Sequence, residues 1–300
     1  MGQHLVFETA SEVLETISGV EINAKQIERI CHKYGQWIGE ADLKLMEKSG
    51  KHIYSKEDSK AVHYASVDGS MYLTREEDWK EIKLGRIFKQ SDIVELSEKR
   101  KMLTQSTYVG HLGNHKEFLP KMEYYLDGLK NLVFIADGAK WIWNWVEDSY
   151  PNSIQILDFF HAKEHLCSFA KEYYSDEKVR EHWIEEQAKC LKEQDVEVFI
   201  KNIQELPISI IPKVQENKRI LLEYYKNHKN RMRYKDFLEQ GLLIGSGAME
   251  DAHKNVLQHR LKLSGQRWTM EGLQQMTQLR VVYKSNKWDR VKEFAIKKAA

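Results

Sequence analysis

The sequence predicts an α/β protein in which a mixed sheet follows a short helical region and is interrupted by a long all-helical insertion. Segments of alternating or continuous apolar residues, typical of strands, fall between residues 61 and 158. No glycine occurs between Gly138 and Gly241, and apolar residues recur there at helical spacing. We therefore expect a helical N-terminal region, a first part of the α/β core, a helical insertion and a C-terminal helix with a basic tail, at residues 1–55, 56–165, 166–240 and 241–300.

The N-terminal region reads as two short amphipathic helices between Thr9 and Tyr34. Ser18-Gly19 breaks the pattern, and Asn23 is placed to cap the second helix. The spacing suits a helix-turn-helix, whose second helix enters the major groove of DNA. Any packed helical hairpin gives the same pattern, so both interpretations stay open.

The predicted sheet begins with two segments that alternate with period two, residues 61–68 and 81–88, and a third strand at 105–111. Helical periodicity follows from Glu117 to Leu129. The short apolar runs at 132–136 and 154–158 are typical of buried central strands. Trp141, Ile142 and Trp145 lie between those runs at helical spacing, so the order predicts a mixed sheet covered by helices.

Composition excludes several classes of protein. With 42% hydrophobic and 30% charged residues the chain is not a disordered tail, and no apolar stretch approaches the length of a membrane span. No secretory signal precedes the first helix. The three cysteines are an odd number without a CxxC pair, which argues against a disulfide framework or a structural zinc site. We expect a cytoplasmic protein without a membrane partner.

The charge is segregated along the chain, although the net charge is only +1. Residues 251–300 carry eleven basic and four acidic residues, a net +7, which leaves −6 on residues 1–250. A basic end on an acidic body favours a polyanionic partner such as nucleic acid. A solvated helix face rich in lysine is the alternative.

Three carboxylates are the strongest candidates for chemistry. Asp68 and Asp137 each end a predicted strand and precede a glycine, and adjacent strands would bring them to one sheet edge. Glu250 lies early in a helix that follows Gly245-Ser246-Gly247, and that helix would complete the site. Carboxylate oxygens suit hard divalent cations and leave room for substrate phosphates. Taken singly, each Asp-Gly pair also reads as a plain turn.

Two further groups of residues point to supporting roles. His161 and His165 share a helix face as zinc ligands do, but no thiolate pair lies near them in sequence, so Asp158 and His161 are better read as supporting the site. The glycine-rich turn before Glu250 lacks the lysine of a nucleotide-binding loop, so a helix cap or close approach to a phosphate fits better.

The tail combines basic residues with an aromatic one, a pattern that suits a nucleic-acid strand. The candidate DNA-binding residues are Arg260, Lys262, Arg267 and Trp268. A core position for Trp268 is an equal alternative.

The strand-end aspartates, the helical glutamate and the helical insertion resemble the DDE transposases, which have an RNase H-like fold. The resemblance is closest to the ISKra4 group of bacterial insertion-sequence transposases. It rests on Val67-Asp68-Gly69, Ala136-Asp137-Gly138, Asp158-Phe159-Phe160-His161 and above all the block from Gly245 to His253, which continues into Arg260-Leu261-Lys262 and Arg267-Trp268.

The resemblance implies that Asp68, Asp137 and Glu250 hold two Mg²⁺ or Mn²⁺ ions for phosphodiester hydrolysis and strand transfer at insertion-sequence ends. It implies double-stranded DNA as the partner, a homo-oligomer on that DNA, and association with the bacterial nucleoid. Relatives of this group usually carry a cysteine-rich region before the helix-turn-helix, which this chain lacks. The alternative expectation is therefore a truncated, non-catalytic DNA-binding remnant. A glycosidase with paired carboxylates fits less well, because it predicts neither a divalent metal nor a cationic tail.

Overall fold

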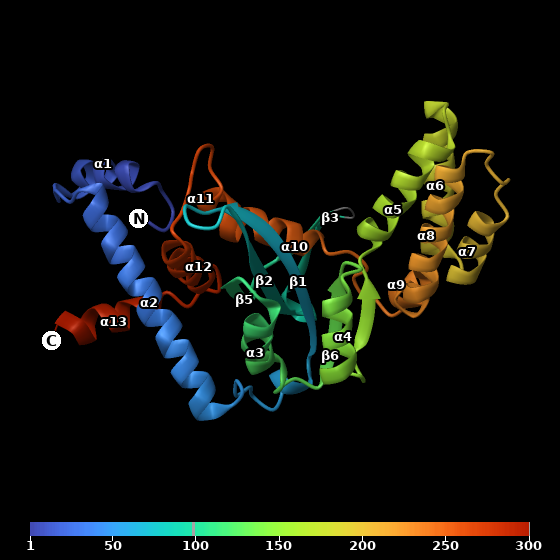
Figure 1. The fold of residues 1–300 in the computed structure, drawn as a ribbon. Coiled ribbons are helices and arrows are strands. Elements are labelled where there is room, and N and C mark those ends of the chain that lie inside the picture. The colour runs from blue at the N-terminus through green and yellow to red at the C-terminus, as the bar shows by residue number, and fades with distance from the viewer. Residues whose placement is uncertain (98–99, 300) are drawn as a thin grey trace. The chain divides into compact units, whose positions relative to one another are not determined.

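The computed structural model describes residues 1–97 and 100–299 (Figure 1). The chain divides into two compact units. The first unit comprises Met1–Leu132 and Ala248–Ala300, and the second comprises Val133–Gly247. Helices accompany antiparallel strands in the first unit and parallel strands in the second. The expectation of an α/β protein with both kinds of strand pairing is confirmed.

The elements of the first unit come from both ends of the chain. In order they are α1 (Phe7–Ser18), α2 (Ala24–Ser49), η1 (Asp58–Lys60), β1 (Val62–Leu73), β2 (Trp79–Lys89), η2 (Gln90–Asp92), β3 (Ile93–Ser97), β4 (Arg100–Leu103), β5 (Thr107–Leu112), α3 (His115–Leu126), α10 (Gly247–Ala252), η4 (His253–Gln258), α11 (His259–Leu261), α12 (Met270–Lys284) and α13 (Asp289–Ala299).

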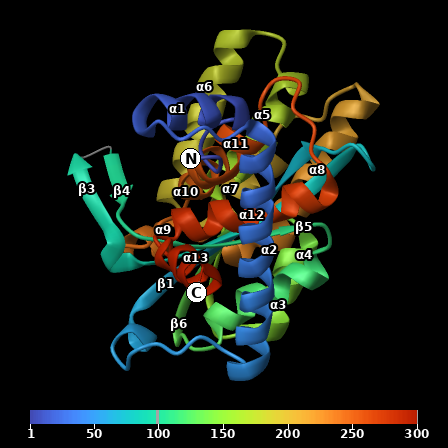
Figure 2. The ribbon, with the colours of Figure 1, turned by 90° about the vertical axis from the view of Figure 1, so that its left-hand side faces the viewer.

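The break and the cap expected in the N-terminal region are both present. Gly19 ends α1 in the left-handed conformation with φ of 66°, and the side chain of Asn23 accepts from the backbone N–H of Gln26 at 2.9 Å. Helix α2 continues to Ser49, well beyond the expected helix, and packs across α12 (Figure 2). Both N-terminal helices therefore bury apolar residues in the core of this unit, and their reading as a DNA-binding motif stays a prediction.

Three antiparallel strands form the sheet of the first unit in the order β5-β2-β1. Asp68, Leu84 and Gly110 stand opposite one another across these strands and so share one face. That face is covered by α10, η4 and α12, whose apolar residues join Ile82 and Leu84 in one core. On the other face Gly85 leaves room for Met122 of α3. The sheet is thus buried between two layers of helix.

The expectation that a strand ends at Asp68 is wrong. Strand β1 runs on to Leu73, so Asp68 lies in its middle and Asp68-Gly69 is not a turn. Glycine fits this position in the strand because it has no Cβ, and the carboxylate of Glu81 occupies the space that a Cβ of residue 69 would fill. The hairpin of β3 and β4 was not expected either. The described side chains of β3 are largely exposed, so no buried alternation marks that strand in the sequence.

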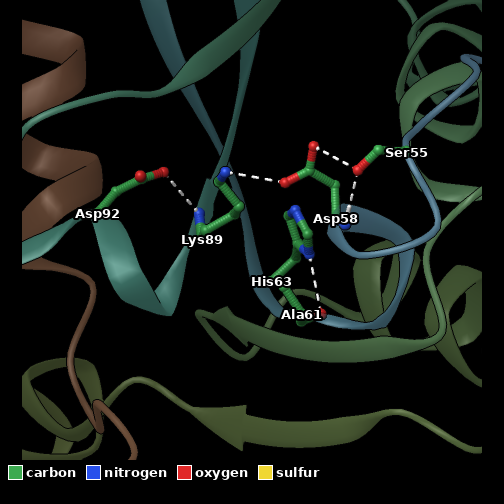
Figure 3. Close-up of polar contacts among 6 residues, drawn as sticks. All are labelled: Ser55, Asp58, Ala61, His63, Lys89 and Asp92. Atoms are coloured by element: carbon green, nitrogen blue, oxygen red, sulfur yellow. Dashed lines mark hydrogen bonds and ion pairs between the residues drawn. The ribbon is translucent and has the colours of Figure 1, made fainter.

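A small polar cluster joins the segment before β1 to the end of β2 (Figure 3). The ammonium group of Lys89 donates to the Asp58 carboxylate at 3.0 Å, and the other oxygen of that carboxylate accepts from Ser55 at 3.0 Å. These bonds lower the pKa of Asp58. The backbone N–H of Lys89 donates to Asp92, so the same residue also fixes the turn into η2.

The second unit is a parallel strand pair with helices. Its elements are β6 (Asn131–Ala136), α4 (Lys140–Ser149), β7 (Ile154–Leu157), α5 (Phe159–Tyr173), α6 (Glu177–Glu193), α7 (Val196–Gln204), α8 (Pro212–His228), η3 (Lys229–Arg231) and α9 (Tyr234–Glu239). The expected strands, helix and helical insertion are confirmed here. Two buried tyrosines hold the helices together, because Tyr234 donates to the carbonyl of Leu157 at the end of β7 and Tyr225 donates to that of Ala162 in α5.

Across residues 1–97 and 100–299, no helix has the length and apolar character needed to cross a membrane.

Candidate functional site

Asp68 presents its carboxylate on the helix-covered face of the sheet while keeping contact with solvent. One oxygen accepts the N–H of Gly69 at 2.7 Å, and 43% of the side chain is exposed. Because a carboxylate accepts at several lone pairs, the group retains capacity to bind a further donor or a cation. Asp68 is therefore an available oxygen ligand held on a rigid strand.

His253, the first residue of η4, lies against this carboxylate. Its Nε2 is 3.4 Å from Oδ2 of Asp68. Its Nδ1 is 3.0 Å from the hydroxyl of Ser70, and that hydroxyl is also 3.0 Å from the hydroxyl of Tyr72. Burial lowers the pKa of His253 against the opposing pull of the Asp68 charge, so the imidazole is neutral at pH 7. The Ser70 hydroxyl donates to the Tyr72 hydroxyl, and Nε2 of His253 is buried beside Asp68 without a hydrogen-bond partner among the described residues.

Glu250 lies on the same helical run, three residues before His253, so the two side chains share one face. Its expected place, early in a helix after the glycine-rich turn, is confirmed, and the residue is exposed. The buried guanidinium of Arg86 on β2 donates to the carbonyl of Ala248 and fixes the start of α10. A π-helical turn follows from His253, a geometry that is frequent at functional sites. The contact of Arg86 with Ala248 and the contact of Asp68 with His253 thus hold the helix of Glu250 against the sheet.

Asp137 belongs to the second unit and directly follows β6, as expected. Its side chain accepts from the N–H of Ala139 at 2.9 Å, and its carbonyl accepts from the indole of Trp143 at 2.6 Å. Gly138 packs against Tyr224 of α8, whose hydroxyl is buried without a hydrogen-bond partner among the described residues. Burial, with Asp137 and Asp158 nearby, raises the pKa of Tyr224. The loop of Asp137 is therefore shaped by the helical insertion.

Asp158 is buried and acts through hydrogen bonds to backbone. One of its oxygens caps α5 by accepting from the N–H of His161 at 2.9 Å, and the other accepts from the N–H of Ser246. Within the second unit it thus joins the start of α5 to the turn that leads to Glu250. The ring of His161 faces Glu164 at 3.4 Å, so its part in the capping is made by its backbone.

The basic tail divides into exposed and buried members. Lys262 and Arg267 are exposed, as phosphate contacts require, whereas Arg260 and Trp268 are 1% and 6% exposed. The expectation that Arg260 and Trp268 contact DNA is wrong for this structure. The Arg260 guanidinium lies against the rings of Phe7 and Trp268, and its Nε donates to the carbonyl of Gly2 at 2.9 Å. Trp268 is core, the alternative reading of the sequence.

A family model described as an uncharacterised protein family, UPF0236, matches residues 5–298. The chain belongs to the UPF0236 family. A comparison with curated proteins finds no match.

In this UPF0236 protein, no group of three or more His, Cys, Asp or Glu side chains within residues 1–97 and 100–299 is arranged to hold a metal ion. Asp68 and Glu250 lie in the first unit and Asp137 in the second. Of these three residues, the structure connects Asp68 with the helix of Glu250, through the contact of Asp68 with His253.

Sequence reasoning assigned no role to His253, Ser70 or Tyr224 in this UPF0236 protein. Ser70 lies two residues after Asp68 and so points to the same face of β1, a signal that the assumed strand end concealed. His253 lies one turn after Glu250, which is a second available signal. Tyr224 is remote in sequence from Asp137, and only the fold relates them.

Proposed function

We propose that this protein is the catalytic region of a DNA transposase of the DDE type, with an RNase H-like core. The observation that carries the proposal is the contact of Asp68 with His253, which joins a carboxylate in mid-sheet to the helix of Glu250. The resemblance implies that the first acidic residue, Asp68 on the strand, lies close to the helix that carries the last one, Glu250. The aspartate at the end of β6, Asp137, is the proposed middle member of the set.

The work of the chain's own residues follows from their contacts. The metal oxygens are assigned to Asp68, Asp137 and Glu250, as the resemblance implies. Ser70 and His253 orient the Asp68 carboxylate, since a neutral ring facing it restricts its rotation without adding a charge. Asp158 holds the turn that precedes the helix of Glu250.

The donor chemistry fits hard divalent cations. The three proposed ligands offer only carboxylate oxygens, and Asp68 keeps lone pairs beyond the one bonded to Gly69. Two Mg²⁺ or Mn²⁺ ions at these residues would activate water or a DNA 3′-hydroxyl and stabilise the leaving oxygen of an in-line displacement at phosphorus. Such a reaction needs no covalent intermediate on the enzyme.

Double-stranded DNA is the proposed substrate, with the element ends and the target site bound by a homo-oligomer. The exposed Lys262 and Arg267 supply positive charge beyond the helix that carries Glu250. Exposed cations of this kind contact phosphates without reading sequence. The acidic ligands and the basic tail are therefore proposed to meet the same polyanion.

The test is cleavage of a labelled duplex that carries the DNA bordering the gene, with Mg²⁺ or Mn²⁺. Wild-type protein is expected to cut, whereas Asp68→Asn, Asp137→Asn and Glu250→Gln each lower the rate by more than a hundredfold. Asp251→Asn is the matched control, because Asp251 is exposed beside Glu250 and is expected to be dispensable. Cleavage that survives Asp137→Asn would overturn the two-metal assignment.

A non-catalytic DNA-binding protein is the second candidate, favoured by the exposed bases of the tail. It predicts salt-dependent duplex binding with no cleavage in either metal, and the same affinity for the three carboxylate variants. Absence of both cleavage and binding contradicts both candidates.

A further inference from the structure

A cavity of about 360 Å³ lies within the first unit among α2, β5, α3 and α12. Its apolar walls include Leu43 and Met46 of α2 and Val281 and Val282 of α12. None of Asp68, Glu250 and His253 is among the described residues that line it. Its volume is in the range of sites for small organic molecules.

Two lysines, Lys121 and Lys287, line this cavity. The ammonium group of Lys287 lies over the ring of Tyr125, 4.6 Å from its centre, and that of Lys121 lies 3.0 Å from Nδ1 of His111. Among the described residues no carboxylate forms an ion pair with either ammonium group. Burial lowers the pKa of both lysines, that of Lys287 to about 8. Both charges are thus largely removed from water and incompletely compensated.

The acidic residues around the cavity are already engaged. Asp42 pairs with Arg290 at 2.5 Å. Glu40 and Glu271 accept from glutamine amides at 2.9 Å and 2.7 Å. His111 is neutral at pH 7 because burial, with the neighbouring Lys121, lowers its pKa to about 4. The lining residues thus include three cations, Lys121, Lys287 and Arg290, and three carboxylates, of which Asp42 acts on both lysines. Glu117 lies against the far side of the His111 ring and also acts on Lys121.

We propose that this cavity binds a small organic anion that has an apolar body and one terminal carboxylate or phosphate group. The anionic group lies between Lys121 and Lys287, and the body lies against Leu43, Met46 and the two valines of α12. A desolvated ammonium group is costly without a counter-charge, so an anion at this position stabilises both lysines. Selectivity for anions follows from these two ammonium groups, because neither has a carboxylate in contact with it.

The test is isothermal titration calorimetry of the full chain with three probes that share a ten-carbon tail: decanoate, decyl phosphate and decyltrimethylammonium. Both anions are expected to bind one per chain, at least tenfold more tightly than the cation. The ratio of the two anion affinities identifies the preferred head group. Equal affinity for the anionic and cationic probes would show binding by the apolar walls alone and would overturn the proposal.

Variants locate the binding. Lys121→Gln and Lys287→Gln are each expected to weaken decanoate binding about tenfold, and Lys287→Arg to retain it. Gly39→Met is expected to abolish binding by filling the cavity, because a Cβ at residue 39 has room and lies 3.7 Å from Gln278. The control is Lys292→Gln in α13, an exposed lysine paired with Asp289. Thermal unfolding verifies each fold, and unchanged affinity in folded Lys121→Gln and Lys287→Gln contradicts the proposal.

Discussion

The buried imidazole of His253 lies 3.4 Å from the carboxylate of Asp68 and connects the helix that carries Glu250 to the middle of the sheet. On its other side the ring contacts the hydroxyl of Ser70. A neutral ring held in this way limits the positions that the Asp68 carboxylate adopts. The relationship makes His253 a positioning residue for the proposed metal ligands.

Replacing His253 with glutamine is therefore expected to lower metal-dependent DNA cleavage by about 10–100-fold, the usual cost of losing a group that orients a metal ligand. The concentration of Mn²⁺ at half-maximal rate is expected to rise, and excess metal to restore part of the activity. His259→Gln is the control, since His259 is exposed on the same helical run. A rate loss with an unchanged metal titration would indicate a structural role only.

Two glycines of α2 provide a paired stability test. A Cβ at Gly35 would overlap the backbone carbonyl of Gln275 in α12, whereas one at Gly39 makes ordinary contact with Gln278 at 3.7 Å. Gly35→Ala is expected to lower the free energy of unfolding by about 2–3 kcal/mol, because α2 must move away from α12. Gly39→Ala is expected to raise it by about 0.5–1 kcal/mol through reduced entropy of the unfolded chain. Chemical denaturation measures both, and similar values for the two variants would contradict this packing.

The sequence allowed the strands and helices to be predicted where burial produces a pattern. The apolar run that ends before Asp137 became β6, and Asn23 capped its helix. The end of β1 was misplaced because Asp-Gly is a strong turn signal, while the space beside Gly69 is occupied by Glu81, a partner from the neighbouring strand. That relationship is tertiary, and no local pattern reports it.

The sequence allowed the acidic residues of the candidate site to be predicted, but not the contacts that hold them in place. The acidic residues were recognisable by position, whereas the network through Ser70 and His253 needed the fold. Arg260 shows the opposite error, because a guanidinium in a basic segment reads as a surface charge. Its burial depends on Phe7 and on Gly2, more than 250 positions earlier in the chain.

The two classes of tail residue predict opposite effects. Lys262→Ala is expected to weaken binding to all duplex sequences alike and to reduce the salt slope of binding by about one, with unfolding unchanged. Arg260→Ala is expected to leave the salt slope unchanged and to lower the free energy of unfolding by about 2–4 kcal/mol, because it empties buried space beside two aromatic rings. Titrations at several salt concentrations, with denaturation curves for each variant, measure both. A reduced salt slope in folded Arg260→Ala would place that residue on the DNA.

The proposed anion cavity predicts a pH dependence that comes from Lys287. Its pKa of about 8 is lower than that of an exposed lysine because burial and the neighbouring Arg290 disfavour the charged form, while Asp42 opposes them. The Lys287 side chain is therefore charged below pH 8 and loses its charge as the pH rises through that value. The side chains of Lys121 and Arg290 still line the cavity above that pH. Decanoate stays ionised throughout this range, so its affinity is expected to fall between pH 7 and pH 9.5 toward that of Lys287→Gln.

The arginine variant isolates the titrating group. Because a guanidinium stays protonated across this range, Lys287→Arg is expected to bind decanoate with nearly constant affinity from pH 7 to pH 9.5. Calorimetric titrations at four pH values on the wild type and this variant measure the difference. An equal decline in both proteins would assign the pH dependence to Lys121, whose pKa burial also lowers, and would remove Lys287 from the anion site.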